Sequence, residues 1–184
     1  MIRCYVTDRR QGKLLSHIAR AVAGGVDMIQ VREKDLSARD LLALVEQVRD
    51  LAAGTPTKVL VNGRLDIALA AGLDGVHLPG DGLPTVRVRP HVRTLGISCH
   101  SIQEAVQAEH DGVDYIIFGP VFETPGKTAA GIEPLRQVVE SIRIPVLAIG
   151  GINDFNTPQV LETGAAGIAG IRLFQSDDYS PEAH

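Results

Sequence analysis

Eight short apolar runs recur along the chain, and they limit the folds that it can adopt more than any other feature. The runs cover residues 4–7, 27–31, 58–61, 74–78, 94–98, 114–118, 145–149 and 166–171. Their shortness and their β-branched content are typical of buried parallel strands. Helical patterns lie between them at 13–23, 37–53, 64–71, 101–110, 132–142 and 155–163, whereas the crossover at 84–91 is weaker and irregular.

Glycines separate the helical patterns from the strands that follow them. This occurs at 24–27, 72–75, 111–114 and 164–167, where a glycine is the expected left-handed helix stop. Eight strands alternating with helices either close into a barrel or open into a doubly wound sheet. No Gly-x-Gly-x-x-Gly follows the first strand, which disfavours the dinucleotide-binding sheet. We predict a compact α/β (β/α)₈ TIM barrel with a short last helix, one domain over residues 1–174, and a polar C-terminal tail over 175–184.

Composition excludes several classes of partner. The net charge of −4 and the lack of a basic block argue against binding to nucleic acid or to an anionic membrane surface. Cys4 and Cys99 form neither a metal-ligand spacing nor a disulfide framework. No signal peptide or long apolar run is present, so we expect a cytoplasmic protein, and a homo-oligomer stays open.

In a barrel of this kind, functional residues gather where the strands end. The second predicted strand leads into Gln30, Arg32 and Lys34, which alternation places on one face. Two cations and an amide at the barrel mouth suit an anionic substrate with a phosphate or a carboxylate. The alternative is that Arg32 and Lys34 pair with neighbouring acidic residues.

Further polar or small residues follow other strands. Asn62 ends the third strand, and a Gly/Pro-rich loop after the sixth carries Thr124 and Lys127. Glycines and exposed backbone N–H groups after the seventh and eighth strands predict a phosphate site, formed by Gly150, Gly151, Gly170 and Ile171. The alternative is that these glycines only turn the chain.

His100 stands at the junction between the fifth strand and the next helix. Ser101 and Glu104 fit a capping box with Ser101 as N-cap, so His100 is the residue just before the cap. The positive end of the helix dipole disfavours imidazolium, which suits a neutral histidine that accepts and returns a proton. An exposed loop histidine is the alternative. His77 lies in the fourth strand and could also face the mouth.

The chain resembles the thiamine phosphate synthase superfamily along nearly its whole length. The resemblance rests on segments at 5–8, 30–34, 75–78, 119–127 and 144–152. It implies a (β/α)₈ barrel that acts on phosphorylated precursors of thiamine.

Two branches of that superfamily differ at positions that can be compared here. The synthase joins a pyrimidine diphosphate to a thiazole phosphate with Mg²⁺, and its two magnesium aspartates align with Gly63 and Gly82, with Asp81 one position out of register. The thiazole tautomerase resembles this chain at residues 62–69 and 98–109, and the resemblance makes His100 its proton-transfer residue. That reaction is a 1,3-proton shift that aromatises a carboxylated dihydrothiazole phosphate.

We therefore predict a thiazole tautomerase with catalytic His100, no metal and no cofactor. Its small-molecule substrate would be a thiazole phosphate, bound by Gln30, Arg32, Lys34, Asn62, Thr124, Lys127, Gly150, Gly151, Gly170 and Ile171. Two alternatives remain: a Mg²⁺-dependent thiamine phosphate synthase, and a non-catalytic regulatory protein that binds a thiamine or thiazole phosphate.

Overall fold

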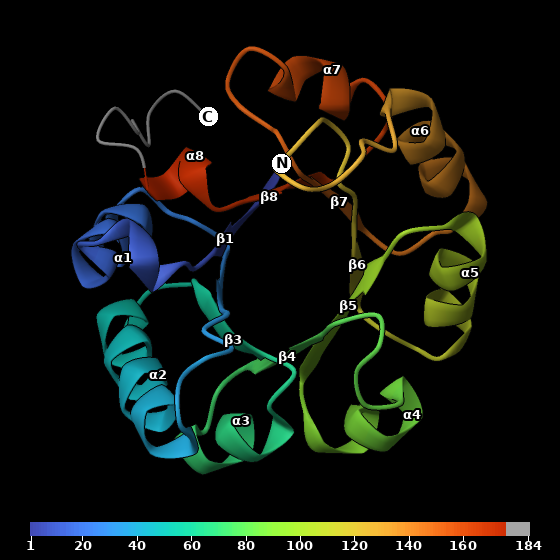
Figure 1. The fold of residues 1–184 in the computed structure, drawn as a ribbon. Coiled ribbons are helices and arrows are strands. Elements are labelled where there is room, and N and C mark those ends of the chain that lie inside the picture. The colour runs from blue at the N-terminus through green and yellow to red at the C-terminus, as the bar shows by residue number, and fades with distance from the viewer. Residues whose placement is uncertain (176–184) are drawn as a thin grey trace.

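Eight parallel strands close into a barrel in the computed structural model, which describes residues 1–175 (Figure 1). Each strand pairs with its neighbours in chain order, and β8 returns to pair with β1. The strands are β1 Ile2–Val6, β2 Met28–Val31, β3 Lys58–Asn62, β4 Gly75–Leu78, β5 Thr94–Cys99, β6 Tyr115–Phe118, β7 Val146–Ile149 and β8 Gly167–Gly170. The predicted (β/α)₈ barrel is confirmed.

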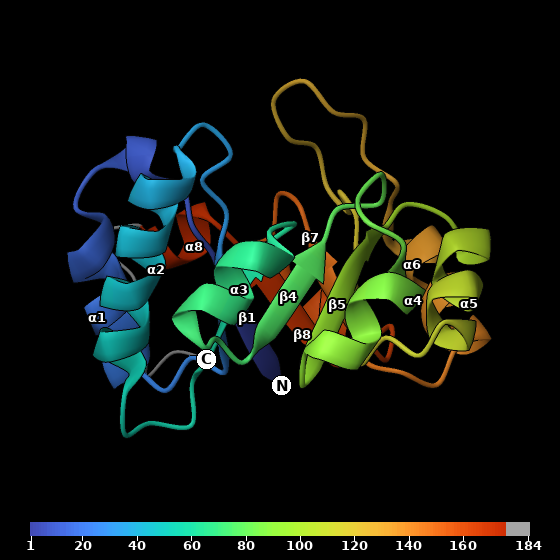
Figure 2. The same cartoon turned by 90° about the horizontal axis from the view of Figure 1, so that it is seen from below.

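Helices surround the barrel in a single ring (Figures 1 and 2). They are α1 Leu14–Ala23, α2 Ala38–Ala52, α3 Leu65–Ala71, α4 Thr85–Val88, α5 Ile102–His110, α6 Ile132–Ser141, α7 Thr157–Leu161 and α8 Arg172–Gln175, with 3-10 turns η1 Arg9–Gln11 and η2 Arg89–His91. The irregular crossover at 84–91 thus folds as α4 and η2. Of the predicted tail, Gln175 belongs to α8, and residues 176–184 lie outside the described residues.

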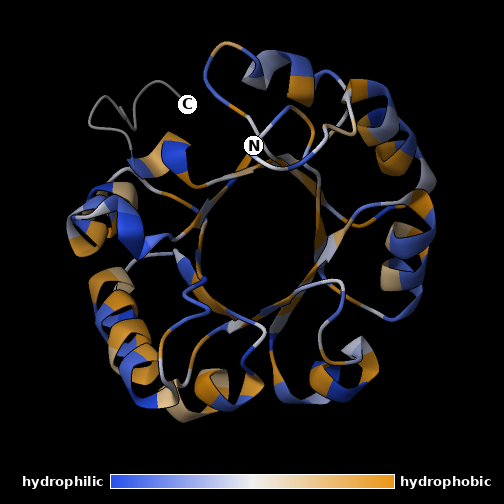
Figure 3. Ribbon diagram, viewed as in Figure 1, coloured by the Kyte–Doolittle hydropathy of each residue, from blue (hydrophilic) through white to orange (hydrophobic). Residues whose placement is uncertain are grey.

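Two apolar cores stabilise the barrel. The larger core lies between the outer faces of the strands and the helices, whose surfaces alternate between hydrophobic and hydrophilic residues (Figure 3). The smaller core fills the barrel interior with Cys4, Val6, Met28, Leu60, Tyr115, Ile117, Leu147 and Ala169. This alternation between the two cores follows the two-residue period of a strand. None of the described helices is long and apolar enough to cross a membrane.

Glycines end the helices as predicted. Gly25, Gly72, Gly112 and Gly164 all have positive φ, between 61° and 89°. This left-handed conformation reverses the chain into the next strand, and it favours glycine because no Cβ is present.

An aspartate lies just before each of the strands β2, β4 and β6, and its carboxylate binds a backbone N–H of the preceding strand, β1, β3 or β5. The carboxylates of Asp27, Asp74 and Asp114 accept the N–H of Arg3, Val59 and Leu95 at 2.7, 2.9 and 2.7 Å. The N–H of each aspartate donates to the carbonyl of the same residue. At the β7–β8 pair, where Ala166 takes the place of the aspartate, its N–H donates to the carbonyl of Val146 and its side chain offers no carboxylate to bind the N–H of β7. The three aspartates therefore hold the register of three strand pairs at the amino end of the barrel.

We expect Asp74→Ala to lower the free energy of unfolding by about 1–3 kcal/mol, because it leaves the N–H of Val59 without its carboxylate acceptor. Asp74→Asn keeps an oxygen acceptor and should lose less. Urea unfolding followed by circular dichroism measures both variants. Asp50→Ala, which removes an exposed carboxylate paired with Arg49, is the control. Equal stability of Asp74→Ala and Asp50→Ala would contradict the assigned role.

Candidate functional site

The inner wall of the barrel is polar on one side and apolar on the other. Strands β2 to β6 carry five polar side chains that project inward, in register with one another or with residues of the interior core. They are Gln30, Asn62, His77, Ser98 and Tyr115. Val6, Leu147 and Ala169 line the side formed by β7, β8 and β1. Because the strands are parallel, the polar side opens at the end where all strands terminate, here called the carboxyl rim. This arrangement suits a ligand with one apolar edge and one hydrogen-bonding edge.

Gln30 and Asn62 form an amide pair in this wall. The Asn62 Nδ2 donates to the Oε1 of Gln30 at 2.8 Å, and Gln30 is 2% exposed. The bond holds both amides in one orientation and leaves the Nε2 donor of Gln30 and the Oδ1 acceptor of Asn62 for a ligand. The structure thus brings together these two predicted substrate-binding residues.

His77 lies beside Asn62 in the register of β3 and β4, and it is 1% exposed. Its Nδ1 contacts the Tyr115 Oη at 3.1 Å and its Nε2 contacts the Ser98 Oγ at 2.9 Å. Burial lowers the pKa of His77 to about 3, with a further contribution from the charge of Arg32. The imidazole is therefore neutral throughout the physiological range.

Arg32 and Lys34 lie beyond the end of β2. Since β2 ends at Val31, the strand alternation that predicted a shared face does not reach Lys34, which is exposed in a turn. Arg32 is half-buried, and its charge acts on His77 inside the barrel. Neither cation forms an ion pair within residues 1–175, so pairing with neighbouring acidic residues, the alternative from sequence, is wrong for this structure.

Glu33 lies between these two cations, and the sequence did not single it out. It is 5% exposed, and its Oε1 accepts from the Thr7 Oγ1 at 2.7 Å and from the N–H of Arg9 at 2.9 Å. Thr7 Oγ1 in turn accepts the N–H of Arg32 at 3.0 Å. Glu33 therefore fastens the β2 exit to the β1 exit and fixes the backbone that carries Arg32. The residues around Glu33 in the sequence give no sign of this role, because its partner Thr7 lies 26 positions away in the chain.

The ends of β7 and β8 lie side by side, since Ile149 pairs with Ala169. The N–H groups of Gly151 and Ile171 donate in none of the hydrogen bonds within residues 1–175. Gly150 and Gly151 also serve packing, because a Cβ at either would lie 2.4 Å from the Pro120 Cβ or 2.7 Å from the Phe122 Cβ. Packing thus explains the two glycines, whereas the unused N–H groups are what an anion site requires.

Gly170 is the last residue of β8, and α8 follows it after Ile171. A Cβ at Gly170 would lie 3.3 Å from the Cβ of Leu173, so the turn into α8 leaves little room for a side chain there.

The loop between β6 and α6 rises above the carboxyl rim (Figure 2). It is joined to β7 by bonds from the N–H of Val121 to the Ile149 carbonyl and from that of Phe122 to the Gly150 carbonyl. Thr124 and Lys127 pair across its turn, with the Lys127 side chain exposed. Lys127 is therefore a third cation on the rim side, carried by an extended loop.

His100 occupies the predicted position before the N-cap of α5. Ser101 Oγ accepts the N–H of Glu104 at 3.2 Å, and the Glu104 Oε2 accepts the N–H of His100 at 2.6 Å. The His100 ring is held by the carbonyl of Gly119, 2.6 Å from its Nδ1. Because a carbonyl only accepts, the Nδ1 carries the hydrogen and the Nε2 of a neutral ring is left as an acceptor.

The rim does not fit the magnesium site that the synthase resemblance implies. Gly63 and Gly82 offer no carboxylate, and a Cβ at Gly82 would lie 2.9 Å from the Pro79 Cδ and 3.0 Å from the Pro79 carbonyl oxygen. Nearby, the carboxylate of Asp66 accepts from the Nε and the Nη2 of Arg64, at 2.9 and 2.7 Å. Within residues 1–175 no group of three or more His, Cys, Asp or Glu side chains could hold a metal ion.

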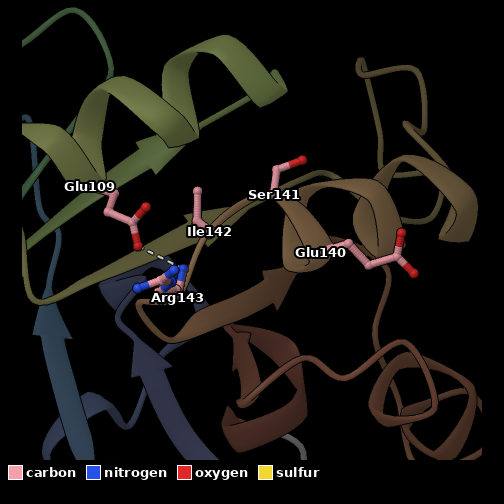
Figure 4. A pocket seen from close by; sticks show the side chains of 5 residues that line it. All are labelled: Glu109, Glu140, Ser141, Ile142 and Arg143. Carbon is pink, nitrogen blue, oxygen red and sulfur yellow. Dashed lines mark hydrogen bonds between the residues drawn. The ribbon is translucent and has the colours of Figure 1, made fainter.

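A pocket also lies at the opposite end of the barrel, where α5 ends and α6 leads toward β7 (Figure 4). The pocket is lined by Glu109, Glu140, Ser141, Ile142 and Arg143. The Glu109 Oε1 accepts the N–H of Arg143 at 2.6 Å and that of Ile144 at 3.2 Å, which ties α5 to the segment before β7. Its carboxylate is used for this connection, and none of the predicted site residues contributes to the pocket.

The low pKa of His77 predicts a pH-dependent stability. Its ordinary value is 6.5 and its folded value is about 3, so below pH 6.5 the unfolded chain binds a proton that the folded chain excludes. Stability should therefore fall as the pH drops from 6.5 toward 3, by up to about 1.4 kcal/mol per pH unit from this residue. Compared with the wild type, His77→Gln should lose about 2 kcal/mol less between pH 7 and pH 5 in urea titrations. His110→Gln, at an exposed helix end, is the control; identical pH slopes for all three proteins would contradict the assignment.

Comparisons with known proteins identify the family. A family model described as thiamine monophosphate synthase matches residues 4–174. A thiamine-phosphate synthase of Methanocella arvoryzae is 41% identical over 94% of this chain and 86% of its own length. One of Chloroflexus aurantiacus is 38% identical over 97% of this chain and 87% of its own.

Solved structures agree with this result. A thiamine phosphate pyrophosphorylase from Pyrococcus furiosus superimposes with a TM-score of 0.90 at 36% identity, covering 99% of this chain and 91% of that one. A 3-hexulose-6-phosphate synthase, at 20% identity, has a TM-score of 0.74 over 100% of this chain and 96% of that one, and shows the shared fold alone.

These findings overturn the predicted tautomerase. The relatives are synthases, so an enzyme of thiamine biosynthesis is supported and the isomerase assignment was wrong. That prediction relied on the glycines at 63 and 82, but missing carboxylates remove a metal ligand without selecting a different reaction. The chain belongs to the thiamine monophosphate synthase family.

Proposed function

We propose that the chain is a thiamine-phosphate synthase, which joins a pyrimidine diphosphate to a thiazole phosphate and releases diphosphate. The observation that carries the proposal is the family match over residues 4–174, together with relatives of that name that align over nearly the whole chain. The inner wall and rim supply the types of group that such substrates require.

Each part of the site has a role in this proposal. The Gln30–Asn62 amide pair and the Ser98 hydroxyl offer neutral hydrogen bonds to a heteroaromatic ring, and the apolar wall opposite packs against its face. The N–H groups of Gly151 and Ile171 bind the phosphate of the thiazole.

Charge neutralisation falls to the cations of the rim. Diphosphate leaves readily only when its negative charge is balanced, a task that Mg²⁺ performs in many enzymes. Because Gly63 and Gly82 do not provide magnesium ligands here, we derive no step through the metal. Arg32, Lys34 and Lys127 form no ion pair within residues 1–175 and are available to bind the diphosphate.

The deciding experiment incubates the purified chain with the pyrimidine diphosphate and the thiazole phosphate and follows thiamine phosphate by chromatography, with Mg²⁺ and separately with EDTA. Product that requires both substrates supports the proposal. Thermal stabilisation by either substrate without product would overturn it and favour the non-catalytic binding protein instead.

Arg32→Ala should lower kcat/KM for the pyrimidine diphosphate by roughly 10- to 100-fold, since it removes charge-assisted hydrogen bonds to phosphate oxygens. Steady-state kinetics with that substrate varied measures the effect. Arg93→Ala is the matched control, because Arg93 is exposed just before β5 at the amino end of the barrel. An equal loss in both variants would show that Arg32 has no specific role.

Mn²⁺ alone should bind to the wild-type chain without a saturable site up to roughly 1 mM, because the rim lacks a carboxylate cluster that could act as its ligands. Electron paramagnetic resonance of free Mn²⁺ measures this binding. Gly63→Asp is the variant for comparison, because it adds a carboxylate to the rim. Aspartate tolerates the left-handed conformation at this position, and its Cβ would lie 3.5 Å from the Pro79 Cδ. A tight stoichiometric site in the wild type would disprove the assignment.

A further inference from the structure

A tyrosine reaches across one strand inside the barrel to contact a histidine on the next. His77, Gly96 and Tyr115 are consecutive partners in the register of β4, β5 and β6. Gly96 has no side chain, and a Cβ there would lie 2.2 Å from the Tyr115 Cζ and 2.6 Å from its Oη. The ring of Tyr115 fills this space, so its Oη comes within 3.1 Å of the His77 Nδ1. A glycine inside a strand thus allows this contact.

The direction of the hydrogen bonds follows from the donors available. Tyr115 is 4% exposed, and within residues 1–175 the His77 Nδ1 is the hydrogen-bond partner of its Oη. Burial raises the pKa of Tyr115 well above its ordinary value, so the phenol keeps its proton. A buried O–H with one acceptor in reach donates to it. The Nδ1 of His77 is therefore the acceptor.

The second ring nitrogen then becomes a donor. A neutral imidazole carries one hydrogen, and when the Nδ1 accepts, that hydrogen lies on the Nε2. The Nε2 contacts the Ser98 Oγ at 2.9 Å, so His77 donates to Ser98. The low pKa of His77 makes protonation of both nitrogens unfavourable.

Ser98 is the last residue in the series of hydrogen bonds Tyr115–His77–Ser98, and it faces the barrel mouth. It lies two residues beyond Gly96 along β5, in register with the interior residue Ile117, and it is half-buried rather than fully enclosed. Within residues 1–175, His77 is the one hydrogen-bond partner of its hydroxyl. Because the Oγ already accepts from His77, the O–H is left to donate.

We propose that Tyr115 is a positioning residue which, through His77, makes Ser98 a hydrogen-bond donor toward an uncharged acceptor atom of the ligand, such as a ring nitrogen of a heteroaromatic substrate. The choice of a heteroaromatic ligand rests on the proposed function, whereas the direction of the hydrogen-bond chain does not. The site would thereby select ligands that present an acceptor, and not a donor, at this point of the wall.

The first test reads the tautomer of His77 and needs no activity. Long-range ¹H–¹⁵N correlation spectra of histidine-labelled protein distinguish the two neutral tautomers, and His77→Gln identifies the resonance. The expected result is the Nε2–H form in the wild type between pH 5 and pH 8. Tyr115→Phe should show a larger share of the Nδ1–H form than the wild type. An Nδ1–H form in the wild type would overturn the proposal, because Ser98 would then donate to His77 and not to the ligand.

The second test links the tautomer to ligand binding. Affinity for the pyrimidine diphosphate and for the thiazole phosphate is measured separately by calorimetry in Tyr115→Phe, Ser98→Ala and the double variant. We expect Tyr115→Phe to weaken one of the two substrates by roughly 5- to 10-fold, and to have no further effect once Ser98 is removed. Additive losses, or no loss in Tyr115→Phe, would overturn the proposal.

Tyr5→Phe is the matched control. Tyr5 is also fully buried, but its ring stacks on Phe174 outside the barrel interior, with the ring centroids 5.3 Å apart. It should change neither the His77 spectrum nor either affinity. If the chain binds the substrates with the expected coupling but forms no product, the proposed synthase fails while the Tyr115 proposal stands.

Discussion

The register of the strands is the constraint on which the site depends. Side chains alternate between the barrel interior and the helix layer, so a slip of one residue would exchange the two sets. Backbone ladders alone allow such slips, whereas the carboxylates of Asp27, Asp74 and Asp114 each bind one particular N–H of the neighbouring strand. These bonds lie at the amino end of the barrel, far from the carboxyl rim, yet they determine which residues meet there.

The correct register produces a wall with two chemical characters. Residues of β2 to β6 bring amides, an imidazole and hydroxyls into the interior, and β7, β8 and β1 bring aliphatic side chains. Burial keeps the polar groups neutral, as the low pKa of His77 and the high pKa of Tyr115 show. Charge is confined to the rim, where Arg32, Lys34 and Lys127 are not paired within residues 1–175. Neutral hydrogen-bonding groups and cations are thus separated by depth.

The missing rim carboxylates show how a correct observation can support a wrong conclusion. Gly63 and Gly82 do lack the side chains that a magnesium site needs, and the close approach of Pro79 to Gly82 makes that absence part of the loop geometry. From that absence, and from the resemblance to the tautomerase at residues 62–69 and 98–109, we inferred a different reaction. The family includes synthases at 41% and 38% identity to this chain, so the missing carboxylates do not place it outside that family.

The periodicity of the sequence was sufficient to predict eight strands, their helices and the glycine stops, because these depend on residues close together in the chain. It also placed Gln30, Asn62 and His100 at strand ends, and Ser101 was confirmed as the N-cap of α5, although the Glu104 carboxylate binds the N–H of His100 and not that of Ser101. The alternation failed at Lys34 because β2 ends at Val31, a boundary set by how Thr7 and Glu33 fasten the chain. Gly96, a glycine inside the fifth strand, is a local sign that another group packs closely against this strand, but the sequence does not identify that group. Only the pairing of β4, β5 and β6 decided that Tyr115 fills that space and reaches His77, because contacts between strands depend on register and not on the sequence of any one strand.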